Sequence, residues 1–427
     1  MRINRRSLIT ASSVITLVVI AILCTPQPQK QTEPEEHISL NSSLNNSLSA
    51  LDQTKKFDAS IERFMRKWEL KGGSFALMRG NNLIYAKGYG QATDDTPCDV
   101  HHIFRVASVS KLITATAIMK LIEQGYISLN SQVFGREGII CDSMFLNLHK
   151  PNLKQITVEH LLRHTAGFSS PHGDPGFTNF GIANFLRKEL PLELDDIVLY
   201  ATKNNLRTTP GANYDYSNLG YMVLTKVIEQ VTHQEYESYV RDSIMAPIGC
   251  YDMHIANNFR REKRENEVYY YETKEAVEDM EEACDGSGRI VMKSDGVNNV
   301  KLLSGAGGWV TSSVELLRFV ASIDGNAEKP DILSKKSIEI MTRDNDHDKP
   351  IGWASVDGAE WLRSGSMSGT SALVKRQSDG YTWVFISNSS AWIGLHLSRH
   401  ISTDISQAIA KVKEWPNRDL FAITDVE

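Results

Sequence analysis

Two β-hairpin signals near opposite ends of the chain constrain its fold more than any other feature. The first covers residues 74–90, where two apolar runs surround Gly80-Asn81-Asn82. The second covers residues 372–387, where Ser378-Asp379-Gly380 separates two further apolar runs. Apolar runs separated by Gly, Asn and Asp predict antiparallel strand pairs. The simplest assembly is therefore one antiparallel sheet to which both ends of the chain contribute.

Helical patterns flank the hairpins and fill the middle of the chain. Residues 57–70 and 392–412 repeat apolar side chains at helical intervals, and the stretch between the hairpins is mostly helix and loop. A hydrophobic content of 41% and a charged content of 23% are typical of a globular protein. We therefore predict an α/β fold of the α+β type: an antiparallel sheet flanked by terminal helices, with an all-α lobe inserted between its two halves.

Residues 104–125 combine a short polar entry with an apolar helical stretch. Ser108 stands at or near the expected helix start, and Lys111 follows one turn later. Side chains three residues apart share a helix face, so the lysine amine can reach the serine hydroxyl. Serine becomes a good nucleophile when a neighbouring group takes its proton, and a desolvated lysine can do this. The alternative is that Ser108 is only a helix cap.

Tyr216-Ser217-Asn218 follows a proline–glycine turn and precedes another expected helix. A tyrosine close to two cations loses its proton more easily than usual, so Tyr216 is a candidate general base. Asn218 is a candidate for holding Lys111 and a substrate amide together. The alternative is that Tyr216 is a core aromatic side chain and that Asn218 caps the helix.

Arg363-Ser364-Gly365-Ser366 stands just before the second hairpin and is expected at a strand edge. A cation, hydroxyls and a glycine would together hold a substrate carboxylate, because arginine binds carboxylates in two places and glycine permits close approach. The backbone N–H groups of Ser366 and Ser108 are candidates for an oxyanion hole. The alternative is that Arg363 pairs with a surface acid.

The first 55 residues are expected to lie outside the folded domain. Residues 1–24 join a basic start to an uncharged, mostly apolar run, the pattern of a signal peptide or signal anchor. We expect export to the periplasmic or extracellular face, with residues 7–24 anchoring the protein in the inner membrane; cleavage or lipidation are the alternatives. Residues 25–55 are expected to form a disordered tether, residues 56–415 the folded domain and residues 416–427 a tail.

Charge and cysteine content exclude several classes of partner. The net charge of −6 gives no reason to expect nucleic acid binding. None of the five cysteines has metal-ligand spacing, and we expect neither a metal nor an organic cofactor. Disulfides among Cys98, Cys141, Cys250 and Cys284 remain open, because spacing does not choose between the pairings.

Four motifs occur in an order and spacing that resemble a known family. They are Phe104–Lys111 (FRVASVSK), His160–Gly167 (HLLRHTAG), Tyr216-Ser217-Asn218 and the glycine-rich Gly305–Ser312. Together they resemble the serine β-lactamase-related family, which takes in class C β-lactamases, low-molecular-weight penicillin-binding proteins, D-aminopeptidases and family VIII esterases. The resemblance runs from about Phe57 to about Val412.

The resemblance implies a β-lactamase/transpeptidase-like fold with its active site between sheet and helical lobe. It also implies that residues 56–415 form a serine hydrolase domain in which Ser108 is the nucleophile, Lys111 its activating partner, Tyr216 the general base and acid, and Asn218 a substrate-positioning residue. The implied partners are small-molecule or cell-wall peptide substrates: D-amino-acid peptides, β-lactams or small esters.

One position departs from the family pattern. Arg363-Ser364-Gly365 stands where the family usually has Lys-Thr-Gly or His-x-Gly. Arginine keeps the positive charge but does not shuttle a proton at ordinary pH. The alternative function is a non-catalytic protein of the same fold that acts as a binding or scaffold protein.

Overall fold

The computed structural model describes residues 39–146, 150–170, 173–273, 280–326, 329–345 and 348–423. The expected membrane anchor at residues 7–24 and the first part of the expected tether therefore lie outside the described residues. Across the described ranges, no helix has both the length and the apolar character needed to cross a membrane.

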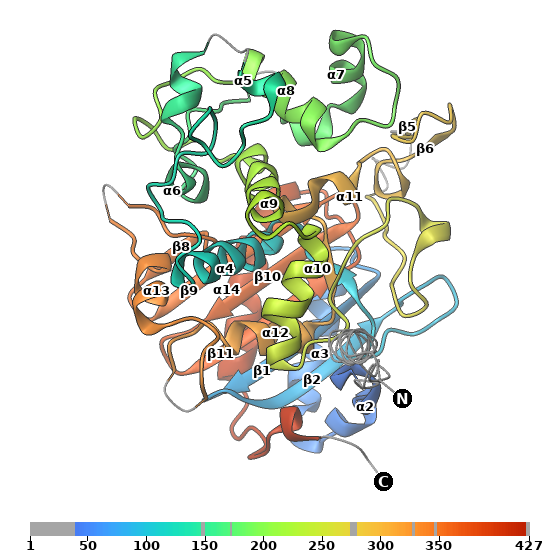
Figure 1. The fold of residues 1–427 in the computed structure, drawn as a ribbon. Helices are drawn as coiled ribbons and strands as arrows, with labels where there is room; N and C mark the ends of the chain where they lie inside the picture. Colours follow the sequence, from blue (N-terminus) through green and yellow to red (C-terminus); the bar gives the residue numbers. More distant parts are fainter. Residues whose placement is uncertain are drawn as a thin grey trace, which may run out of the picture. The chain divides into compact units, whose positions relative to one another are not determined.

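Both ends of the chain contribute to one six-stranded antiparallel sheet, as predicted (Figure 1). Its strand order is β2-β1-β11-β10-β9-β8. The first hairpin supplies two neighbouring strands at one edge, and the Gly80-Asn81 turn between them has φ angles of 53° and 60°, as a tight hairpin turn requires. The strands are β1 (Gly72–Arg79), β2 (Asn82–Gly90), β8 (Ser355–Asp357), β9 (Glu360–Met367), β10 (Thr370–Arg376) and β11 (Tyr381–Ser387).

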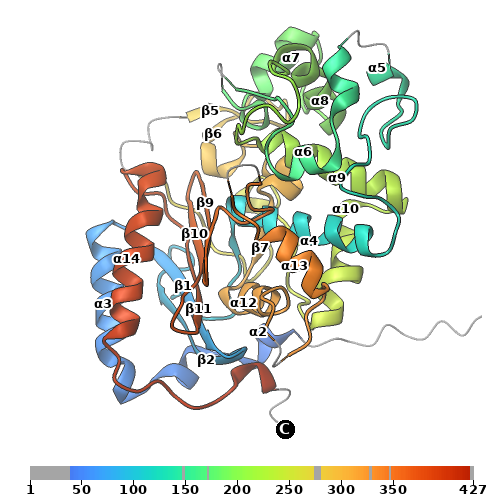
Figure 2. The same cartoon turned by 90° about the vertical axis from the view of Figure 1, so that its left-hand side faces the viewer.

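Two terminal helices cover one face of this sheet (Figure 2). They are α3 (Lys55–Lys67) and α14 (Leu397–Ala410), which pack against each other. Strand side chains alternate between faces, and Phe75, Trp383 and Phe385 form an apolar cluster with the buried side chains of both helices. The prediction of terminal helices flanking the sheet is therefore confirmed.

The opposite face of the sheet packs into an apolar core that includes the helix beginning after Ser108. Helix α12 (Ser313–Ala321) packs on β1 and β11. Helix α4 (Ser110–Glu123) is buried on all sides over most of its length, because its apolar residues lie between the sheet and the helical part of the chain. A three-stranded sheet in the order β3-β7-β4 lies beside them, with β3 at Phe104–Arg105, β7 at Trp309–Thr311 and β4 at His254–Ile255.

The inserted segment forms a mostly helical lobe (top of Figure 1). Helix α9 (Asn218–Thr232) connects this lobe to the rest, because it contacts α4 as well as α6 and α8. Helix α6 begins after Thr157, whose side chain forms a capping box with His160. The lobe and its surroundings contain α5 (Ser143–Leu146), α6 (Val158–Leu162), α7 (Asn179–Leu186), α8 (Leu194–Asn204), α10 (Tyr236–Val240), α11 (Val300–Leu303), α13 (Lys335–Met341), β5 (Met280–Glu282) and β6 (Ile290–Met292).

Residues 39–54 differ from the expected disordered tether. They form α2 (Leu40–Ser43) and two 3-10 turns, with Leu40 and Leu44 buried. The side chain of Asn46 donates to the carbonyls of Gly88 and Cys98 at 3.1 and 3.0 Å, which ties this segment to the hairpin. The polar composition of this segment did not predict its ordered structure, because the order depends on contacts that bury its few apolar residues against distant parts of the chain.

The expected tail is partly buried, and the open question of disulfides is answered for the described residues. Leu420 and Phe421, expected in a tail, are buried in the core. Cys98, Cys141, Cys250 and Cys284 are all free thiols, so no disulfide joins the described residues.

Candidate active site

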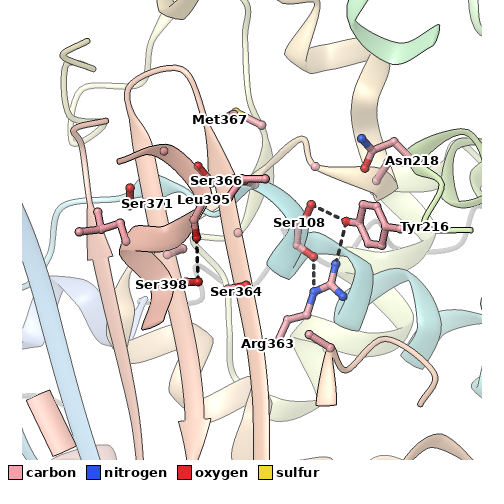
Figure 3. A pocket seen from close by; sticks show the side chains of 18 of the residues that line it. Ser108, Tyr216, Asn218, Arg363, Ser364, Ser366, Met367, Ser371, Leu395 and Ser398 are labelled. Atoms are coloured by element: carbon pink, nitrogen blue, oxygen red, sulfur yellow. Dashed lines mark hydrogen bonds between the residues drawn. The ribbon is translucent and has the colours of Figure 1, made fainter. Parts of the chain in front are cut away.

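A cavity of about 550 Å³ opens between the β9 end of the sheet and the helical lobe (Figure 3). Its size is in the range of small-molecule sites. Seven of the eight residues singled out from the sequence line it, and Lys111 lies directly behind its wall. The lining residues among them are Ser108, Tyr216, Asn218, Arg363, Ser364, Gly365 and Ser366.

Ser108 lies in a 3-10 turn, Ala107–Val109, that leads directly into α4. Ala107 has a φ of 48°, a left-handed conformation that is costly for a residue with a Cβ atom. Such strain persists only where the surroundings enforce it. The position of Ser108 at a helix start is therefore as predicted, and its turn is held in a specific conformation.

Gly365 on β9 allows the sheet to approach this turn. A Cβ atom at position 365 would lie 2.3 Å from the carbonyl oxygen of Val106 and 2.9 Å from the backbone nitrogen of Ser108. The sequence suggested that this glycine makes room for a substrate. The structure gives a different reason for it, since the strand itself packs against the turn that carries Ser108.

Lys111 is fully buried one turn after Ser108. Its Nζ lies 3.3 Å from Ser108 Oγ and donates to Asn218 Oδ1 at 2.6 Å and to the Ala306 carbonyl at 2.5 Å. Burial, opposed by Tyr216 and assisted by the charge of Arg363, lowers the pKa of the Lys111 amine to about 8. The amine is therefore far easier to deprotonate than an ordinary lysine.

Tyr216 brings its hydroxyl oxygen to 2.7 Å from Ser108 Oγ. Loss of water around the hydroxyl would alone raise its pKa, but the charges of Lys111 and Arg363, together with its hydrogen bonds, lower the pKa of Tyr216 to about 7. Its side chain is 41% exposed at the cavity wall, so it is not a core aromatic. A phenol of this pKa beside a serine hydroxyl is able to accept the serine proton near neutral pH.

Arg363 is buried, with 3% of its surface exposed, and faces inward rather than toward a surface acid. Its Nε donates to the Ser108 carbonyl at 2.8 Å, and its Nη2 donates to the Tyr216 hydroxyl at 3.2 Å (Figure 3). Two of its nitrogens are thus engaged by the site itself. These contacts involve no substrate, so the expected role as a fork for a substrate carboxylate stays a prediction.

The β9 residues reach the cavity from two faces of the strand. Arg363 and Gly365 point toward the Ser108 turn, and Ser364 and Ser366 alternate to the other side. Strand β8 pairs only with residues 360–362, so the rest of β9 is unpaired on that side and borders the cavity. The predicted strand edge is therefore found at residues 363–366, which β10 pairs on one side only, although β8 pairs with the beginning of β9.

Asn218 is the first residue of α9, and the helix is capped by Ser217 instead. The Asn218 side chain accepts from Lys111 through Oδ1 and donates to Asp174 Oδ2 at 2.8 Å through Nδ2. The alternative interpretation of Asn218 as the helix cap is therefore wrong. Its amide joins the buried cation to a carboxylate on the lobe.

Two residues at the site were not identified from the sequence. Asp174 lines the cavity from a loop in which Gly173, Pro175 and Gly176 are its neighbours. His164 packs its ring 4.6 Å from the Tyr216 ring and accepts from the Ser217 N–H at 3.2 Å. Burial, with the charges of Lys111 and Arg363, holds the pKa of His164 well below its ordinary value, so this ring is neutral. The sequence offered one signal for each: an acid directly before a Pro-Gly turn, and a histidine inside the His160–Gly167 motif.

The described residues contain no group of three His, Cys, Asp or Glu side chains arranged to hold a metal ion. The chemistry that the arrangement can perform is proton transfer and nucleophilic attack by side chains: a serine hydroxyl in contact with a phenol and an amine, both of which have a lowered pKa.

Comparison with known proteins identifies the chain's relatives. The family model described as Beta-lactamase matches residues 57–399. Protein flp of Staphylococcus aureus (strain MRSA252) is 25% identical over 225 residues, which cover 50% of this chain and 40% of that protein. Penicillin-binding protein 4* of Bacillus subtilis (strain 168) is 25% identical over 390 residues, covering 85% of this chain and 76% of that protein.

Solved structures share the same fold. The D-amino acid amidase from Ochrobactrum anthropi SV3, complexed with L-phenylalanine amide, superposes with a TM-score of 0.65 at 20% identity and covers 85% of this chain and 100% of the amidase. The octameric penicillin-binding protein homologue from Pyrococcus abyssi superposes with a TM-score of 0.60 at 22% identity, covering 84% of this chain and 79% of that one. At these identities the likeness concerns the fold, which matches the predicted β-lactamase/transpeptidase type.

Proposed function

This chain belongs to the beta-lactamase family, and from that premise we propose that it is a serine hydrolase acting on amide or ester bonds through an acyl-enzyme. The observation that carries the proposal is the cluster around Ser108 Oγ. The Tyr216 oxygen lies 2.7 Å from it and Lys111 Nζ lies 3.3 Å from it, and both groups have a lowered pKa.

The first step is attack by Ser108 on the substrate carbonyl. Tyr216, in its ionised form, takes the proton from Ser108 Oγ as the new C–O bond forms. The charges of Lys111 and Arg363 stabilise the phenolate before the reaction and the surrounding hydrogen bonds keep it in place. Tyr216 then returns the proton to the leaving nitrogen or oxygen, and an ester on Ser108 results.

The negative charge on the carbonyl oxygen needs donors as the tetrahedral intermediate forms. We assign this role to the backbone N–H groups of Ser108 and Ser366, which stand on the turn and on the strand that Gly365 brings together. Asn218 contacts Lys111 from the opposite wall and is placed to donate its amide to a substrate carbonyl. Water then releases the acyl group with Tyr216 again as the base.

The substrate classes we consider are D-amino-acid peptides, β-lactams and small esters, and names among the relatives include a penicillin-binding protein and a D-amino acid amidase. Turnover of a D-alanyl peptide, a cephalosporin and a chromogenic ester tests the proposal. We expect at least one to be hydrolysed and the activity to disappear in Ser108→Ala. No turnover of any of them, with no covalent labelling of Ser108, would favour the non-catalytic binding or scaffold protein.

We also propose that the protein is exported and held at the inner membrane by residues 7–24. The basic start followed by an uncharged apolar run supports this, since it is the pattern of a signal anchor. The catalytic domain would then meet its substrates on the periplasmic or extracellular face.

A further inference from the structure

Asp174 places a carboxylate on the lobe side of the cavity that contains Ser108. It precedes the 3-10 turn Pro175–Phe177, and its Oδ1 accepts from the Gly176 N–H at 2.9 Å. Its Oδ2 accepts from Asn218 Nδ2 at 2.8 Å. These two bonds fix the carboxylate in position, and each oxygen keeps a further lone pair for another donor.

The cations of the site do not neutralise this carboxylate by direct contact. Lys111 and Arg363 are directed to Ser108, Tyr216 and Asn218, and both are buried. Among the described residues, no lysine, arginine or histidine side chain lies within ion-pair distance of Asp174. Asp174 and Arg363 are the only charged side chains in the cavity lining that the structure describes, and Asp174 is the more exposed of the two.

A fixed carboxylate with free acceptor positions beside a nucleophile favours a substrate with a positive charge near its scissile bond. The α-ammonium group of an amino acid amide or ester has this charge at neutral pH, since α-amino groups have pKa values of about 7.7–8.0. It also offers three N–H donors on the carbon next to the carbonyl. The apolar side chains of Phe177, Leu303 and Leu395 line the same cavity and suit an apolar substrate side chain.

We propose that Asp174 binds the ammonium group of the substrate, so that the preferred substrates are aminoacyl amides or esters with a free amino group. This inference rests on the proposed hydrolase function and narrows it to one substrate class. It also predicts that an acyl group with a carboxylate in place of the amine binds poorly, because it would meet a like charge.

Protection of Ser108 from a fluorophosphonate tests the inference without requiring turnover. Both enantiomers of phenylalaninamide and of N-acetylphenylalaninamide are used as competitors of the labelling. The free amines should protect at concentrations about 10- to 100-fold lower than the N-acetyl compounds, the ratio expected for a charge-assisted hydrogen bond. Equal protection by the two, or none by either, would overturn the inference.

Three variants separate recognition from a structural role. Asp174→Asn should remove the preference for the free amine, and Asp174→Glu, which keeps the charge, should retain part of it. Glu189→Gln is the matched control, because Glu189 is exposed on the same lobe outside the cavity lining and its loss changes the net charge equally. If Asp174 only positions Asn218, Asp174→Asn will weaken both competitors alike, and recognition of the amine is refuted.

The same experiment distinguishes the two levels of the proposal. Absence of labelling at Ser108 in the wild-type protein would contradict the hydrolase function itself. Labelling at Ser108 without a preference for the free amine would leave that function standing and remove the substrate assignment alone.

Discussion

Arg363 should control the pH at which the site becomes active, and Arg363→Gln measures this directly. The substitution removes the charge and retains a side chain that can donate hydrogen bonds. In the protein, Arg363 Nη2 lies 3.2 Å from the Tyr216 oxygen, and its charge acts with that of Lys111 to lower the pKa of Tyr216 to about 7. Without the guanidinium, the phenol should hold its proton to higher pH.

The expected rise in the pKa of Tyr216 follows from its distance to Arg363 and from its exposure to solvent. A unit charge pair at 3.2 Å interacts with about 1.3 kcal/mol in water and about 5 kcal/mol at an effective dielectric constant of about 20. Tyr216 is 41% exposed, so the value lies toward the water limit. Because about 1.4 kcal/mol corresponds to one pH unit, we expect the pKa of Tyr216 to rise by about 1 to 2.

The assay measures kcat/KM as a function of pH. The fall in kcat/KM on the acid side of this profile (the acid limb) reports the ionisation of groups in the free enzyme. Its midpoint belongs to the coupled Lys111 and Tyr216 pair. Removal of Arg363 raises the pKa of both members, so the limb should move from near 7 to about 8–9. Activity lost at pH 7 should return in part at higher pH.

Two comparisons make the result decisive. Arg363→Lys keeps a positive charge and should shift the limb less than Arg363→Gln. The test is the pH at which the acid limb falls, and not the maximum value of kcat/KM. Arg363 also donates to the Ser108 carbonyl, so its loss can lower that maximum for a structural reason. An acid limb that stays in place in Arg363→Gln, with only the plateau reduced, would refute the electrostatic role.

Three further predictions concern the proton-transfer pair, the strand contact and the location. Lys111→Ala, Tyr216→Phe and the double mutant should have similar residual rates, because the pair acts as one unit; a double-mutant loss equal to the product of the single losses would argue against this. Gly365→Ala should lower the free energy of unfolding by about 1–3 kcal/mol in denaturant and reduce labelling of Ser108, because the new Cβ would lie 2.3 Å from the Val106 carbonyl oxygen. An unchanged free energy of unfolding would contradict this close contact. Protease added to intact spheroplasts should digest the catalytic domain if residues 7–24 anchor an exported protein, and protection of the domain would rule this out.

The elements that local pattern determines were predictable from the sequence. The Gly80-Asn81 turn, the apolar repeat of α4 and the Thr157 cap each act through residues a few positions apart. The closeness of Ser108 and Lys111 was predictable in the same way, because the two residues are three positions apart at the start of one helix. Such features need no knowledge of the rest of the fold.

The features that were missed depend on contacts between distant segments. Arg363 donates to the Ser108 carbonyl across 255 residues, and strand alternation turns it away from the hydroxyls beside it. Asp174 is held at the site in part by Asn218 of α9, which lies 44 residues further along the chain. Residues 39–54 have the composition of a disordered segment, and their order comes from partners such as Gly88 and Cys98.

Covalent capture of Ser108 is the measurement that tests the central claim most directly. An alkyl fluorophosphonate should add one phosphonyl group as a bond forms between Ser108 Oγ and phosphorus and fluoride leaves. Peptide mapping should locate the adduct on Ser108, and Ser108→Ala should abolish it. Ser398→Ala should retain it, since Ser398 lines the same cavity from α14. An adduct on a different serine, or full labelling of Ser108→Ala, would contradict the account.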